Sequence, residues 1–189
     1  MTGSAIALFT LWLVLSVLSL WIWLPVGRGP AATVRANRPA RIAVLAGLML
    51  LIGTSAILSA VSPTLDGPWR WVAGALGIAV SLLGGGALTT IILSLAGNAT
   101  GATARVQRDV LRGGAWIGAL ERLAVLGTLV AGWPEGLAGI VAIKGLARYP
   151  ELRTASTTGG GGASERFIIG TLASLGWAAV CAWVLAGLL

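Results

Sequence analysis

Six charged residues in the C-terminal half of the chain are the ones whose types and spacing could do chemistry. They comprise four bases and two acids: Glu121, Arg122, Lys144, Arg148, Glu165 and Arg166. All six lie in or beside apolar stretches, where a charge costs about 2.5–3.5 kcal/mol on insertion scales and therefore needs a partner. The excess of positive charge could be satisfied by a small anion or by the phosphate of a lipid headgroup.

Three interpretations of this cluster are open. Adjacent residues of a helix point about 100° apart, so Glu121 and Arg122 should face different neighbours. Lys144 and Arg148 are one turn apart and can meet Glu121, in which case the cluster is an ion-pair network that fixes helix packing. The other two interpretations are an anion or lipid-phosphate site and a proton relay through Glu121.

The rest of the composition argues against an enzyme. The 189 residues contain no histidine and one cysteine, Cys181, so the commonest metal ligands and the commonest general base are missing. The four glycines at 159–162 lack the Lys-Ser/Thr pair that follows in a phosphate-binding loop. Catalysis would be left to Glu121 with Lys144 or Arg148. We therefore expect no enzymatic activity, no metal and no cofactor.

Long apolar stretches must position these residues in lipid. Hydrophobic residues make up 57% of the chain and charged residues 10%, with a mean hydropathy of +0.91, which exceeds what one soluble core needs. About 20 apolar residues cross a bilayer as a helix. The sequence therefore predicts an all-α, polytopic membrane protein with a single transmembrane domain over residues 1–189. Its six expected spans are about 5–26, 42–62, 70–96, 114–132, 135–149 and 165–188.

The ends of the last two spans carry specific expectations. The fifth span has about fifteen residues, or about 22 Å at 1.5 Å per residue, so its flanks must extend it or the bilayer must thin. Residues 150–164 begin with a proline and hold four consecutive glycines, which predicts a flexible loop. Ser164 then predicts an N-cap, with Glu165 in the first turn of the last span.

Three glycines, Gly84, Gly85 and Gly86, lie in the middle of the third span. One interpretation is close contact between helices, as at other small-residue interfaces in membranes. The other is a broken helix that lines a substrate site, as in transporters with discontinuous spans.

Basic residues predict the orientation in the membrane. The connectors 26–41, 97–113 and 144–166 hold eleven of the thirteen Lys and Arg residues, and Arg70 lies in an opposite connector. By the positive-inside rule, the three connectors are cytoplasmic and both termini lie outside. Three spans per half would also allow an inverted 3+3 arrangement. An arginine-rich, alanine-rich and glycine-rich composition favours a bacterial inner membrane.

One basic connector has a further pattern. Arg105, Arg108 and Arg112 are spaced three and four apart and share one helical face. This spacing predicts a juxtamembrane helix that rests on anionic lipid headgroups. Because topology explains the net charge of +7, we expect membrane lipids and not nucleic acid as partners.

Three strings between residues 113 and 175, GAWIGALERL, AIKGLARYPEL and SERFIIGTLAS, carry a resemblance. They resemble the C-terminal half of an uncharacterised bacterial membrane-protein family known only as a domain of unknown function. The resemblance implies no activity. It implies that nine positions belong to recurring motifs: Gly118, Glu121, Arg122, Lys144, Arg148, Glu165, Gly170, Thr171 and Ser174.

These features together predict a small transporter or channel-like protein, which we expect to be a homo-oligomer. It would bind an anion or a phosphate-bearing lipid at a basic cluster on the cytoplasmic side of the membrane. The alternative is a non-catalytic membrane subunit that scaffolds a larger complex, since the chain has almost no soluble mass and no recognised substrate motif.

Overall fold

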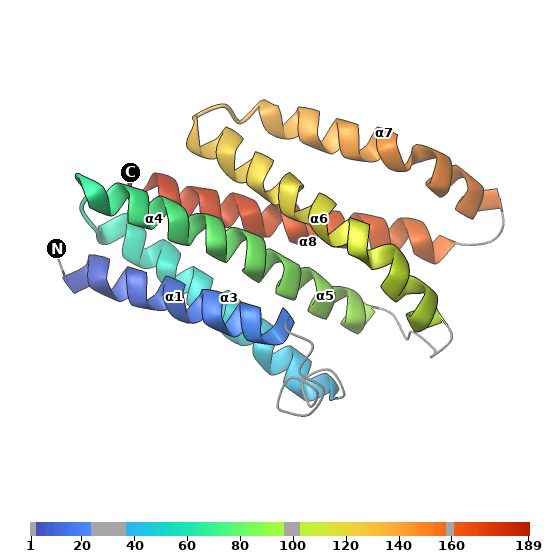
Figure 1. Ribbon diagram of the computed structural model, residues 1–189, viewed down its shortest axis with the longest axis horizontal. Coiled ribbons are helices and arrows are strands. Elements are labelled where there is room, and N and C mark those ends of the chain that lie inside the picture. Colours follow the sequence, from blue (N-terminus) through green and yellow to red (C-terminus); the bar gives the residue numbers. More distant parts are fainter. Residues whose placement is uncertain (1–2, 24–36, 97–102, 158–160) are drawn as a thin grey trace.

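The described part of the chain folds as long helices that lie side by side. The computed structural model describes residues 3–23, 37–96, 103–157 and 161–189. In chain order the elements are α1 (Gly3–Trp23), α3 (Arg38–Val61), α4 (Pro68–Ala79), the π-helical turn η1 (Val80–Gly84), α5 (Gly85–Ala96), α6 (Thr103–Val130), α7 (Gly136–Thr157) and α8 (Gly161–Ala186). The elements α4, η1 and α5 follow one another without a break and form one rod, residues 68–96 (Figure 1). These ranges contain no strand, so the prediction of an all-α fold is confirmed.

Four of the described helices are long and apolar enough to cross a membrane. They are α1, α3, the rod and α8, whose apolar segments have mean hydropathies of 1.9–2.3. Helices α6 and α7 carry Glu121, Arg122, Lys144 and Arg148 and run alongside the others (Figure 1). A helix satisfies its own backbone hydrogen bonds, which is what a segment in lipid requires. The architecture is therefore that of a polytopic membrane protein.

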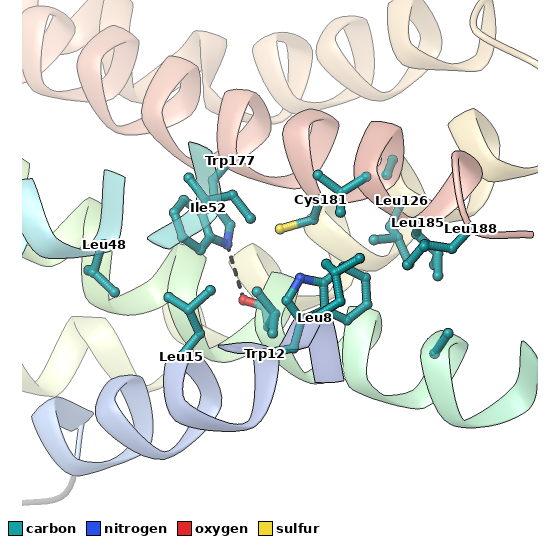
Figure 2. Packing of buried hydrophobic residues seen from close by; sticks show 14 of the residues in the cluster. Leu8, Trp12, Leu15, Leu48, Ile52, Leu126, Trp177, Cys181, Leu185 and Leu188 are labelled. Carbon is teal, nitrogen blue, oxygen red and sulfur yellow. Dashed lines mark hydrogen bonds between the residues drawn. The ribbon is translucent and has the colours of Figure 1, made fainter. Parts of the chain in front are cut away.

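Helix α8 occupies the centre of the packing and contacts α3, α5, α6 and α7. Its buried face carries Trp177, Cys181 and Leu185, which meet residues of α1 and α3 in the main core (Figure 2). The outer faces are apolar as well: Leu50 and Ile57 on α3 are each 70% exposed. A bundle that is apolar outside as well as inside is suited to lipid and not to water.

Successive helices run in opposite directions, so the two termini lie at the same end of the bundle (Figure 1). At that end the Leu65 N–H donates a hydrogen bond to the Leu188 carbonyl at 2.8 Å, which ties the turn before α4 to the C-terminus. At the other end Arg41 Nη1 donates to the Ser94 carbonyl at 3.1 Å and joins α3 to α5. Taken in chain order, α1, α3 and the rod each run in the direction opposite to that of α6, α7 and α8, respectively (Figure 1).

Helix α7 and helix α8 extend further than the sequence predicted. Helix α7 continues through Pro150 to Thr157, and α8 begins at Gly161. The flexible loop predicted at 150–164 is therefore wrong for most of its length, and residues 158–160 lie outside the described residues. A proline costs about 3 kcal/mol inside a helix, but good helix formers on both sides carry the helix past it. Ser164 lies inside α8 and is not its N-cap.

The length of α7 bears on the short fifth span that the sequence predicted. Its 22 residues give a length of about 33 Å, enough to match the hydrocarbon thickness. Helix α7 is not among the four described helices that are long and apolar enough to cross a membrane, so its role as the fifth span stays a prediction.

Helix α6 also begins earlier than predicted. Residues 97–113 were expected to form a separate juxtamembrane helix, but the segment from Thr103 is the start of a continuous 28-residue helix. Two consecutive glycines follow Arg112, and at about 1 kcal/mol each they do not stop the helix. Arg105 and Arg108 lie with Arg112 on these first turns, and the side chains of all three lie outside the described residues.

A Schellman motif ends α6. The Trp133 N–H donates to the Thr128 carbonyl at 2.8 Å, and the Gly132 N–H donates to the Leu129 carbonyl at 3.1 Å. Gly132 has a φ of 73°, a left-handed conformation in which a Cβ atom would clash with the backbone. This turn fixes the hairpin of α6 and α7.

We expect Gly132→Ala to lower the free energy of unfolding by about 1–2 kcal/mol, because the left-handed backbone conformation is unfavourable for alanine. Equilibrium unfolding in detergent micelles measures the change. Gly127→Ala is the matched control, since a methyl group there meets nothing within 4 Å and lies in a helix where alanine is favoured. Equal losses in both variants would contradict the role of the turn.

Candidate functional site

Glu121 and Arg122 on α6 point to different helices, as the sequence predicted. Glu121 Oε2 accepts a hydrogen bond from Lys144 Nζ of α7, and the two side chains form an ion pair. Arg122 Nη1 donates to Ser174 Oγ of α8 at 3.0 Å. Neighbouring residues about 100° apart on one helix can serve two interfaces in this way.

The ion pair joins α6 to α7. The side chains of Glu121 and Lys144 are 12% and 18% exposed, so most of both groups is removed from solvent. Helix α7 packs on α6 and α8 at the edge of the bundle (Figure 1). Of the three interpretations, an ion pair that fixes helix packing is the one that describes the contacts of Glu121 and Lys144.

The other charged residues of the predicted cluster lie on α7 and α8. Arg148 lies one turn beyond Lys144 with an exposed side chain. Glu165 is exposed and Arg166 is half-buried, both in the first turns of α8. Arg166 precedes Ser174 by eight residues, or about 12 Å along the helix. The longer α8 therefore places its first charges about two turns from the serine that Arg122 contacts, and the grouping of all six residues in one cluster stays a prediction.

The candidate site is the environment of Arg122, whose side chain is 5% exposed. A methyl group at Gly85 would lie 2.9 Å from Arg122 Nε, and one at Gly118 would lie 3.3 Å from Nη1. Both glycines therefore pack closely against the Arg122 side chain, and a methyl group at Gly85 would force it to shift. Its Nε is buried and has no hydrogen-bond partner among the described residues. Within the same residues no carboxylate forms an ion pair with Arg122.

Arg122 lies near the middle of the bundle and not toward one membrane face. Its partner Ser174 comes thirteen residues after the start of α8 at Gly161 and twelve before its end at Ala186. Gly85 is likewise seventeen residues into the rod, with eleven after it. At 1.5 Å per residue each is about 16 Å or more from either end of its helix. The structure thus places Arg122 at mid-bundle, whereas the cytoplasmic side of the site stays a prediction.

The three glycines of the third span lie where the rod meets α8. The rod stays helical there and makes one π-helical turn that ends at Gly84. The indole Nε1 of Trp177 donates to the Val80 carbonyl at 3.1 Å (Figure 2), and a side chain that inserts into the backbone ladder is a known cause of such a local change. A methyl group at Gly84 would lie 2.9 Å from Cε2 of the same indole. Close packing therefore describes the glycines, and the broken helix does not.

Trp177 is the residue of this site that the sequence interpretation did not single out. It is 3% exposed and contacts both Gly84 and Gly85. Tryptophan is enriched at membrane interfaces, so a tryptophan in the middle of a span is the feature that could have drawn attention to it.

Comparison of the chain with known protein families, with curated proteins and with solved structures gives no match. The resemblance of residues 113–175 to a family of unknown function therefore stays a prediction. Of its nine positions, the structure brings Glu121 to Lys144, and it brings Arg122 to Ser174 and Gly118.

Proposed function

We propose that the protein is a small membrane carrier or channel-like protein that binds an anion at Arg122, inside the helix bundle. One observation carries the proposal: a guanidinium buried to 5% exposure donates to a neutral hydroxyl and has an Nε without a partner among the described residues. A buried charge is stable only with a counter-charge and satisfied hydrogen bonds.

The nearest acid already forms an ion pair with another residue, so Arg122 has no carboxylate partner of its own among the described residues. Glu121 precedes Arg122 in the chain but forms its ion pair with Lys144 of α7, about 100° around α6 from the direction of Arg122. A bound anion would supply both the missing negative charge and an acceptor for the free Nε–H. Because lipid phosphates lie at the membrane surface and Arg122 lies at mid-bundle, a small anion suits the site better than a lipid headgroup.

Anion-dependent thermal stability of the purified protein tests this proposal. We expect chloride, nitrate or inorganic phosphate to raise the melting temperature at constant ionic strength, and Arg122→Gln to remove the rise. Ligand at 100 times its Kd stabilises a protein by about 2.7 kcal/mol, a readily measured shift. Ser174→Ala keeps the guanidinium, removes its hydroxyl partner and should weaken the shift.

The control for this experiment is Arg70→Gln, since Arg70 is exposed at the start of the rod. It should keep the full shift. Loss of the shift in this variant would mean that anions act on surface charge. A wild-type protein without any shift, or an Arg122→Gln variant that keeps it, would overturn the proposal.

The proposed setting is a bacterial inner membrane with both termini outside. The basic residues of the three arginine-rich segments include those in the first turns of α3 and of α6 and those in the second half of α7, and these helix ends lie at the end of the bundle opposite to the termini (Figure 1). The positive-inside rule assigns that end to the cytoplasm. An anion entering from either side would then have to travel about half the length of the bundle to reach Arg122.

A further inference from the structure

Four polar side chains where α1 packs against the rod are buried without a hydrogen-bond partner among the described residues. They are Trp12, Ser16 and Ser19 on α1 and Ser81 in η1. Trp12, Ser19 and Ser81 are each at most 1% exposed. A helical serine can bond to a carbonyl of its own helix, and buried Ser55 and Ser59 of α3 do so at 2.9 Å. The hydroxyls of Ser16, Ser19 and Ser81 are therefore available to another group.

The spacing along the rod connects these side chains to Arg122. A methyl group at Gly77 would lie 3.2 Å from Cζ3 of Trp12, and one at Gly85 would contact Arg122. Ser81 lies four residues from each of these glycines, so the three positions follow one stripe of the rod. Ser81 is thus about one turn, or about 6 Å along the axis, from the level of Trp12 and from that of Arg122.

Ser16 and Ser19 of α1 continue this line at matching levels. Helix α1 and the rod run in the same direction (Figure 1), and the two pack against each other around η1. Ser16 follows Trp12 by one turn, as Ser81 follows Gly77, so Ser16 comes level with Ser81. Ser19 lies nearly one turn further along α1.

The donors along this line determine what they can bind. An indole Nε1–H and a guanidinium Nε–H donate only, whereas a serine hydroxyl donates and accepts. The four side chains and Arg122 include no carboxylate. A group of donors without an acid favours an acceptor, and the smallest ligand that accepts from several donors at once is an inorganic anion.

We propose that Trp12, Ser16, Ser19 and Ser81 form a second binding station for the anion that Arg122 binds. Arg122 is then one position on a path along the stripe of the rod between α1 and α8, and the protein moves the anion instead of only holding it. This inference rests on the proposed function. It adds the direction of the path, toward the end of the bundle where Trp12 and the termini lie.

Anion flux in proteoliposomes tests the second station. Vesicles loaded with chloride are diluted into a chloride-free buffer, and a chloride electrode follows efflux after a potassium ionophore sets the membrane potential. We expect Ser19→Ala combined with Ser81→Ala to slow efflux about tenfold or more, the effect of losing hydrogen bonds to a charged group. The anion-dependent thermal shift should remain, because Arg122 and Ser174 are unchanged.

Two further variants separate the station from general effects of serine removal. Ser55→Ala combined with Ser59→Ala removes two buried hydroxyls that already bond to their own helix, and this control should transport at the wild-type rate. Trp12→Phe keeps an aromatic ring against Gly77 and removes the N–H, and it should slow efflux while the protein stays folded by size-exclusion chromatography.

The outcomes distinguish this inference from the proposed function. Wild-type efflux in the Ser19 and Ser81 double variant overturns the second station and leaves the Arg122 site standing. A wild-type protein that shows the thermal shift but no efflux above empty vesicles also overturns the path. Absence of the thermal shift in the wild type overturns the proposed function itself, and the second station falls with it.

Discussion

Gly84→Leu is expected to lower the free energy of unfolding by about 3 kcal/mol or more, the upper part of the range for overpacking a close-packed interior. A methyl group at Gly84 already lies 2.9 Å from Cε2 of Trp177, and that indole is held in place by its hydrogen bond to the Val80 carbonyl. Neither the ring nor the backbone can move aside without losing this bond. Equilibrium unfolding in detergent micelles measures the loss.

The matched control for this prediction is Gly74→Leu on the same rod. A methyl group at Gly74 meets nothing within 4 Å, and leucine has a higher helix propensity than glycine. Gly74→Leu should therefore leave the stability unchanged or raise it. If both variants lost the same stability, the cause would be hydrophobic bulk in the third span and not the contact with Trp177.

The long apolar helices could be predicted because lipid imposes length and composition on each span. Their ends could not. Pro150 and the two glycines after Arg112 are local breakers whose cost is about 1–3 kcal/mol, and the structure carries α7 and α6 past them. No local sequence pattern predicts the π-helical turn. The turn lies where the indole of Trp177, on another helix, donates to the Val80 carbonyl.

One part of the candidate site could be predicted, because a charged side chain in an apolar span needs a partner of opposite charge. Glu121 and Lys144 lie on neighbouring helices of one hairpin, so their pairing followed from the cost of leaving either alone in lipid. The partner of Arg122 did not follow, because it is a neutral hydroxyl 52 residues away. No charge pattern identifies one serine among many, and only the packing of α8 against α6 selects Ser174.

Breaking the ion pair from one side is the second large effect that we expect. Lys144→Met leaves the Glu121 carboxylate without its partner in a mostly buried position, and the removal of one partner of a buried pair costs about 3–5 kcal/mol. Glu121→Leu should cost a similar amount, since it strands the ammonium group. The double variant should recover most of the loss, because two apolar side chains of similar size suit the surroundings. Unfolding of the four proteins as a double-mutant cycle gives the coupling energy.

The same double variant separates the roles of the two faces of α6. Because Glu121 and Lys144 lie on one interface and Arg122 on another, the Glu121→Leu and Lys144→Met protein should keep the anion-dependent thermal shift and the efflux of the wild type. Loss of both in a stable double variant would place the carboxylate inside the transport path and favour a proton relay through Glu121. A double variant as unstable as either single variant would contradict the pair itself. Efflux that survives the loss of the pair would leave Arg122 as the charge on which binding depends.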